Sequence, residues 1–129
     1  MDDNAWSQAS LPLCYGGLGI RKVSEVALPA FLASAHGSSD MVRLLNPSRM
    51  SEDSIAHLDT AVQKWSNFLA GSQGGDLPIK PSAQNLWDKP LCDLRHDSLL
   101  RATTSEIELA RLKAVSAKHA SDWLKAYPV

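Results

Sequence analysis

The chain has 129 residues, the usual size of one domain and enough to enclose a single hydrophobic core. Hydrophobic residues make up 44% of it, an ordinary share for a globular protein, which excludes wholesale disorder. The formal net charge of −1 counts against a dedicated nucleic-acid-binding domain, which would carry a clear excess of basic residues.

Cysteine usage and the N-terminal residues set further limits. Cys14 and Cys92 form no CxxC motif and no Cys/His cluster with zinc spacing, so we expect two small buried hydrophobes in a reducing compartment. Asp2 and Asp3 stand where a signal peptide would be basic, and no stretch reaches the ~18 apolar residues of a membrane span. We expect an intracellular protein, in cytoplasm or nucleus, without membrane contact.

The first 22 residues are predicted to be irregular. Residues 1–10 are polar and should fray. Residues 11–20 are rich in glycine, which lowers helix stability, so they are expected to form a structured loop. The residues that interrupt this stretch are Pro12, Gly16, Gly17 and Gly19.

Helical patterning begins just after this loop. Ser24 is a plausible N-cap, and Pro29 is expected near the first turn of the helix, where a missing N–H does little harm. Gly37 is expected to stop or kink this helix. One of residues 38–40 would then cap a short second helix ending near Leu45.

The next predicted helix starts at Ser51 and ends near Gly71, and residues 71–81 form a loop by composition. Its apolar residues recur at helical spacing and should form one buried stripe. The stripe consists of Ile55, Leu58, Val62, Trp65, Phe68 and Leu69.

Two further helices are predicted toward the C-terminus. One begins at Ser82, with a kink or break near Pro90, and stops at residues 103–105. Ser105 and Glu108 form a capping box for a last long helix over residues 106–118, and a short final helix follows around Trp123 and Leu124. The residues expected to face inward on the long helix are Ile107, Ala110 and Ala114, together with Leu112 and Val115.

These elements predict an all-α fold. We expect a single domain over residues 1–129, with an irregular bundle of about five helices over residues 23–129 after the Gly-rich segment of residues 1–22. Large aromatic side chains dominate core burial, so each tryptophan is expected to anchor the core. The four tryptophans are Trp6, Trp65, Trp87 and Trp123.

The glycine turn has two interpretations. It matches neither Gly-x-Gly-x-x-Gly nor a Gly-Lys-Ser/Thr phosphate loop, and tight backbone packing of Gly16, Gly17 and Gly19 is the favoured explanation. The alternative is a set of backbone N–H groups that face a phosphate. Arg21 and Lys22 are then the cations that would contact it.

No constellation of catalytic or metal-binding residues stands out. The histidines are scattered, and the carboxylate pairs lie at predicted helix starts or on the frayed end, where they require no catalytic role. A small hydrolase stays open as an alternative, but no nucleophile–base pair can be named for it. We therefore expect no enzyme activity, no cofactor and no metal. The histidines are His36, His57, His96 and His119.

Basic residues alternate along the predicted last helix. Arg111 and Lys118 are seven residues apart and would share a face, whereas Arg111 and Lys113 would not. The shared face is either a nucleic-acid contact surface or a solvated outer face.

Three stretches of the chain together resemble one protein family. They are Gln8-Ala-Ser-Leu-Pro-Leu-Cys-Tyr-Gly-Gly-Leu-Gly-Ile-Arg21 with its continuation to Ala35, then Trp87-Asp-Lys-Pro-Leu-Cys92, and finally residues 110–128. In this order they resemble the thumb and linker region that follows the catalytic palm in non-LTR (LINE-type) retrotransposon reverse transcriptases. The polymerase's paired aspartates are not found in this chain.

The resemblance implies a detached, non-catalytic piece of such an RNA-directed DNA polymerase. A helical support of this kind would contact the backbone of an RNA–DNA hybrid or another nucleic acid weakly, without reading its sequence. The alternative is a helical protein–protein interaction module that uses apolar faces once covered by the palm. The candidate backbone contacts are Arg21, Lys22, Arg111, Lys113 and Lys118.

Overall fold

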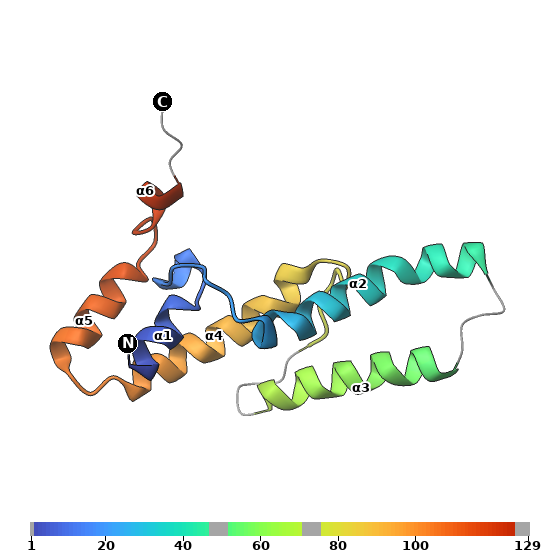
Figure 1. The fold of residues 1–129 in the computed structure, drawn as a ribbon, viewed down its shortest axis with the longest axis horizontal. Helices are drawn as coiled ribbons and strands as arrows, with labels where there is room; N and C mark the ends of the chain where they lie inside the picture. Colours follow the sequence, from blue (N-terminus) through green and yellow to red (C-terminus); the bar gives the residue numbers. More distant parts are fainter. Residues whose placement is uncertain (1, 47–51, 71–75, 126–129) are drawn as a thin grey trace. The chain divides into compact units, whose positions relative to one another are not determined.

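The structure is a computed structural model that describes residues 2–46, 52–70 and 76–125. Across these ranges the chain forms α-helices and one short 3-10 helix, and no strand (Figure 1). The predicted all-α class is confirmed.

Contacts within the chain group the residues into two compact units, which we describe separately. The hairpin unit comprises Val23–Leu91, and the terminal unit comprises Met1–Lys22 together with Cys92–Val129. The prediction of one domain over residues 1–129 stays a prediction.

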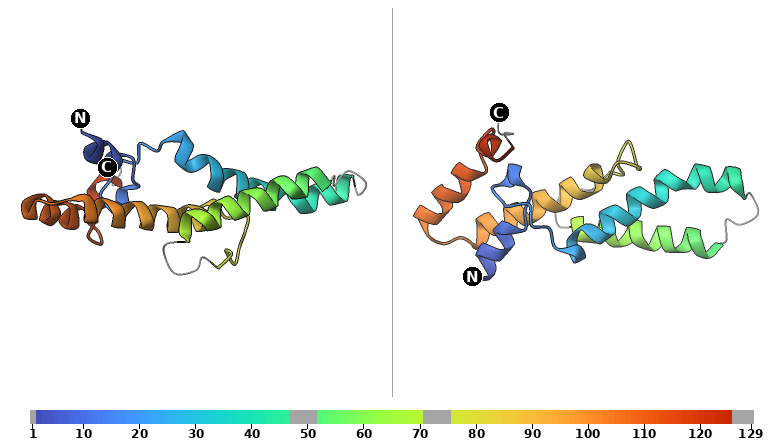
Figure 2. Two further views of the ribbon diagram at one scale, coloured as in Figure 1. Left: turned by 90° about the horizontal axis from the view of Figure 1, so that it is seen from below. Right: turned by 45° about the horizontal axis from the view of Figure 1, so that its top comes forward.

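Two long helices form most of the hairpin unit. Helices α2 (Val23–Leu45) and α3 (Glu52–Leu69) run antiparallel and side by side (Figures 1 and 2). The first part of α4 (Gln84–Ala102) adds Trp87 and Leu91 to their core. The predicted stripe of α3 is buried at Trp65 and Leu69 and partly buried at Leu58 and Val62, while Phe68 is exposed and the side chain of Ile55 lies outside the described residues.

Helix α2 runs through Gly37, so the predicted stop and the short second helix are wrong. The serines that were expected to cap a new helix instead hydrogen-bond back to the preceding turn. Ser38 Oγ donates to the carbonyl of Ser34 at 2.9 Å, and Ser39 Oγ donates to that of His36 at 3.0 Å. This back-bonding is a regular option for serine inside a helix.

Prolines lie inside two of the helices. Pro29 is the seventh residue of α2 and is buried, so it lies beyond the first turn. Pro90 is the seventh residue of α4, which continues from Gln84 to Ala102 without the predicted break. A proline inside a helix removes one backbone hydrogen bond and crowds the carbonyl four residues earlier, yet both helices continue past it.

The terminal unit has its own small core. Leu11, Leu99 and Leu112 are buried together, with Tyr15 and Leu100 packed against them. Its elements are α1 (Asp3–Ala9), the 3-10 helix η1 (Leu13–Tyr15), the second part of α4, α5 (Glu106–Val115) and α6 (Asp122–Lys125).

Helix α1 was not among the predicted elements, since residues 1–10 were expected to fray. Asp2 caps it by accepting a hydrogen bond from the backbone N–H of Ala5 at 2.7 Å. Ala9 and Ser10 at its end are buried, which ties the helix to the unit. The segment of residues 1–22 is therefore partly helical rather than irregular throughout.

Helix α5 is shorter than predicted. Ser105 caps its start as expected, but the helix ends at Val115, and residues 116–121 form turns with His119 at a φ of 69°. Only Leu112 of the residues expected to face inward on α5 is buried, and Ile107 is 67% exposed. Helical spacing alone did not show which face of α5 meets the core.

The tryptophans divide into two classes. Trp65 and Trp87 are buried, whereas Trp6 is 41% exposed and Trp123 is 74% exposed. The expectation of four core anchors is thus right for two of them.

The two cysteines also differ: Cys92 is buried but Cys14 is exposed. No helix in the described ranges is long and apolar enough to cross a membrane.

Candidate nucleic-acid interface

The backbone N–H groups of the glycine turn all have partners within the chain. Every backbone N–H from Tyr15 to Arg21 donates to a carbonyl of residues 9–19. Leu18 and Ile20 both donate to Ala9, and Gly19 donates to Leu11 at 2.9 Å. Since these donors already have partners, the turn offers no ready N–H group to a phosphate. This observation favours the packing interpretation over the phosphate interpretation.

Close packing explains why glycine is needed at two of the three positions. A Cβ on Gly17 would lie 1.9 Å from the carbonyl oxygen of Leu11. A Cβ on Gly16, whose φ is 78°, would lie 2.6 Å from Cγ2 of Val115. Gly19 has a φ of 71° but open space around it, so only its backbone conformation requires glycine.

A polar contact joins the glycine-rich segment to α4. The Tyr15 hydroxyl donates a hydrogen bond to Oδ1 of Asp93. Burial, followed by this bond and the charge of Asp93, raises the pKa of Tyr15 well above its usual value. Tyr15 therefore stays protonated and acts as a donor at every physiological pH.

A second contact joins the same segment to α5. Ser116 Oγ lies 3.0 Å from Nε2 of His96, 2.6 Å from the carbonyl oxygen of Leu112 and 3.1 Å from that of Tyr15. The hydroxyl has one hydrogen, for which the two carbonyls compete, and the direction of its bond to His96 depends on the tautomer of the imidazole ring. A hydroxyl whose hydrogen is shared with backbone carbonyls is poorly placed to pass its proton to His96, which disfavours the hydrolase alternative.

Two of the candidate cations flank α1. Arg21 and Lys22 are half-buried, and Nζ of Lys22 lies 5.8 Å from the ring centroid of Trp6. Lys22 already contacts this ring and Arg21 has an interaction partner of its own, so a phosphate would have to compete with existing contacts.

The other three candidates lie on or after α5, and all are exposed. Arg111 pairs with Glu108 at 2.8 Å, which offsets part of its charge. Lys113 lies in the last turn of α5. Lys118 lies beyond the end of α5, so the expected shared helical face with Arg111 does not exist. All five candidates belong to the terminal unit, but they are divided between the segment before α2, helix α5 and the turns after it.

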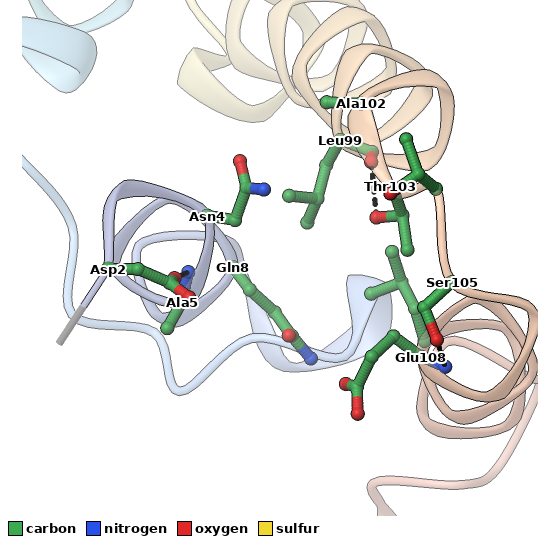
Figure 3. Close-up of a pocket in the computed structure, with 11 residues that line it drawn as sticks. Asp2, Asn4, Ala5, Gln8, Leu99, Ala102, Thr103, Ser105 and Glu108 are labelled. Carbon is green, nitrogen blue, oxygen red and sulfur yellow. Dashed lines mark hydrogen bonds between the residues drawn. The ribbon is translucent and has the colours of Figure 1, made fainter.

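A hollow of about 270 Å³ lies between α1 and the start of α5 (Figure 3). Leu99 and Leu112 form part of its lining, and Asp2 and Glu108 supply carboxylates. None of its lining residues is a lysine or arginine, which disfavours a phosphate there. Several of its polar groups are already used, since Asp2 caps α1 and Ser105 caps α5.

Potential metal ligands and comparisons with known proteins give no further indication of function. Among the residues that the structure describes, no group of three His, Cys, Asp or Glu side chains could hold a metal ion. Comparison with models of protein families, with curated proteins and with solved structures found no match.

Sequence reasoning missed the polar contacts of the terminal unit. Tyr15 and Ser116 are 101 residues apart, and no local motif links them. The spacing of Asp93 and His96 places them near each other on α4, which was the one available signal. Their partners depend on the tertiary fold.

Proposed function

We propose that this chain is a non-catalytic helical element that contacts nucleic-acid backbone weakly, as expected for the reverse-transcriptase thumb and linker region that it resembles. The supporting observation is the location of the five candidate cations in one compact unit. That unit holds eight Lys and Arg against seven Asp and Glu, whereas the hairpin unit holds five against seven.

The charge balance argues for weak, sequence-independent contact. An excess of one basic residue gives little long-range attraction, and Arg111 already pairs with Glu108. Lysines without neighbouring groups that read base edges would contact phosphates only. Such binding releases counterions and weakens steeply as salt increases.

Fluorescence anisotropy of a labelled RNA–DNA hybrid across a salt series tests the proposal. The informative variant is the double substitution Lys113→Gln with Lys118→Gln. A matched control is Lys64→Gln with Lys80→Gln, which removes the same charge from exposed positions of the hairpin unit. We expect the first variant to bind more weakly at low salt, with a shallower salt dependence, and the control to bind like the wild type.

Two results would count against the proposal. Equal loss of binding in both double variants would indicate a general charge effect without a surface on the terminal unit. Incorporation of nucleotides in the presence of Mg²⁺ or Mn²⁺ would contradict a non-catalytic role.

A second candidate function is a helical protein–protein interaction module. It is favoured by apolar side chains exposed near the end of α2, where Leu44 is 84% and Leu45 is 79% exposed. Exposed apolar patches on a soluble domain often mark interaction surfaces. Light scattering and binding of an apolar dye would test it, with Leu44→Ser and Leu45→Ser as variants. A sharp monomer with no dye binding would contradict it.

A further inference from the structure

The ammonium group of Lys22 lies over the ring of Trp6, which is partly exposed. The Trp6 side chain is 41% exposed, and Nζ of Lys22 lies 5.8 Å from the ring centroid, within the range of a cation–π contact. Trp123 is more exposed, but within the described part of the chain no Lys or Arg lies against its ring. Trp65 and Trp87 are buried.

The fold of the terminal unit holds this pair together. Trp6 lies on α1, whose end is fixed by hydrogen bonds from Leu18 and Ile20 to the carbonyl of Ala9. These bonds bring the segment that leads to Lys22 back along α1. The aromatic ring and the ammonium group are therefore presented together by a structured turn.

We propose that Trp6 stacks against an unpaired nucleobase while Lys22 contacts the adjoining phosphate, so that the terminal unit prefers single-stranded over fully paired nucleic acid. The inference rests on the proposed nucleic-acid function and adds the strand form that is recognised. A partly exposed indole with an ammonium group next to its ring matches the two parts of a nucleotide, its aromatic base and its phosphate.

Base pairing explains the expected preference. In a duplex each base is already stacked between its neighbours, so its faces are not free for Trp6. An unpaired base keeps a free face, and stacking on an aromatic side chain tolerates any sequence. Trp123 offers a ring without the adjacent cation and should contribute less.

Anisotropy titrations with two labelled probes test this inference on the full chain. One probe is a blunt RNA–DNA hybrid, and the other is the same hybrid with a single-stranded extension. The variants are Trp6→Leu, Trp6→Phe and Lys22→Gln, and the matched control is Trp123→Leu. Circular dichroism establishes that each variant keeps its helices.

We expect the wild type to bind the extended probe roughly tenfold more tightly than the blunt one. Trp6→Leu should abolish this preference, Trp6→Phe should keep part of it, and Trp123→Leu should leave it unchanged. Lys22→Gln should weaken binding of the extended probe and lower its salt dependence.

Two outcomes would overturn the inference in distinguishable ways. Equal binding of both probes, or a preference that survives Trp6→Leu, would overturn the stacking role and leave backbone contact in place. No binding of either probe at low salt would overturn the proposed nucleic-acid function together with this inference.

Discussion

The indole N–H of Trp65 donates a hydrogen bond to the backbone carbonyl of Trp87 at 2.9 Å, and the two rings meet edge to face with centroids 4.9 Å apart. The indole N–H of Trp87 donates in turn to the carbonyl of Pro81 at 2.7 Å. Both buried donors are therefore satisfied, as buried tryptophans require. The contact joins α3 to the start of α4 and fixes the core of the hairpin unit.

Trp65→Phe should destabilise the hairpin unit by about 1–3 kcal/mol, because it removes buried volume and the bond to the Trp87 carbonyl. Urea unfolding followed by circular dichroism measures the change. Trp123→Phe is the control, since a change at this exposed position should stay within about 0.5 kcal/mol. Equal effects of the two substitutions would contradict the difference in burial between Trp65 and Trp123.

Gly17→Ala should destabilise the terminal unit far more than Gly19→Ala. The new Cβ at position 17 would meet the Leu11 carbonyl at 1.9 Å, and backbone must move to relieve it. At position 19 there is open space, and the cost is limited to the left-handed φ, roughly 1–2 kcal/mol. Thermal unfolding of both variants gives the comparison. A tolerated Gly17→Ala would contradict the close approach to Leu11.

Tyr15 should make stability fall at high pH. Burial first, and then Asp93, raises its folded-state pKa above the unfolded value of about 10. The contribution of protonated Tyr15 to the free energy of unfolding is therefore fully present below about pH 10 and decreases as the pH rises above that value. Urea unfolding at pH 7, 9 and 11 should show the stability difference between wild type and Tyr15→Phe shrinking at the highest pH. A constant difference would count against the raised pKa.

His36→Phe should keep or increase stability. The His36 ring stacks on Trp87 with centroids 5.6 Å apart, and its Nε2 is buried with no hydrogen-bond partner among the described residues. Phenylalanine keeps the stacked ring and removes the unsatisfied nitrogen, a gain of about 1 kcal/mol. His36→Ala removes the stack as well and should destabilise. The denaturant midpoint should stay the same or rise in His36→Phe and fall in His36→Ala.

Gly37→Ala should stabilise α2 by about 0.5–1 kcal/mol, because alanine restricts the unfolded chain and favours the helix. A Cβ at this position would meet Ser82 Cβ at 3.5 Å, an ordinary contact. The thermal midpoint should rise slightly. A clear decrease would indicate that the helix needs glycine at this position.

The sequence by itself determined the fold class and several helix boundaries. Apolar spacing around Trp65 indicated α3, and Ser105 marked the start of α5, because these signals act within one or two turns of the chain. The same local signals wrongly predicted a stop at Gly37 and a break near Pro90, since α2 and α4 continue through these residues. A single residue of low helix propensity can be accommodated when packing and back-bonded side chains support the helix around it.

The tertiary structure decided which residues are buried and which polar groups meet. Trp6 and Trp65 look alike in sequence, yet only Trp65 has another tryptophan, from a different helix, packed against it. The bond between Ser116 and the Tyr15 carbonyl spans 101 residues and has no local signature. Burial and long-range hydrogen bonds depend on which elements pack together, and short-range patterns do not contain that information.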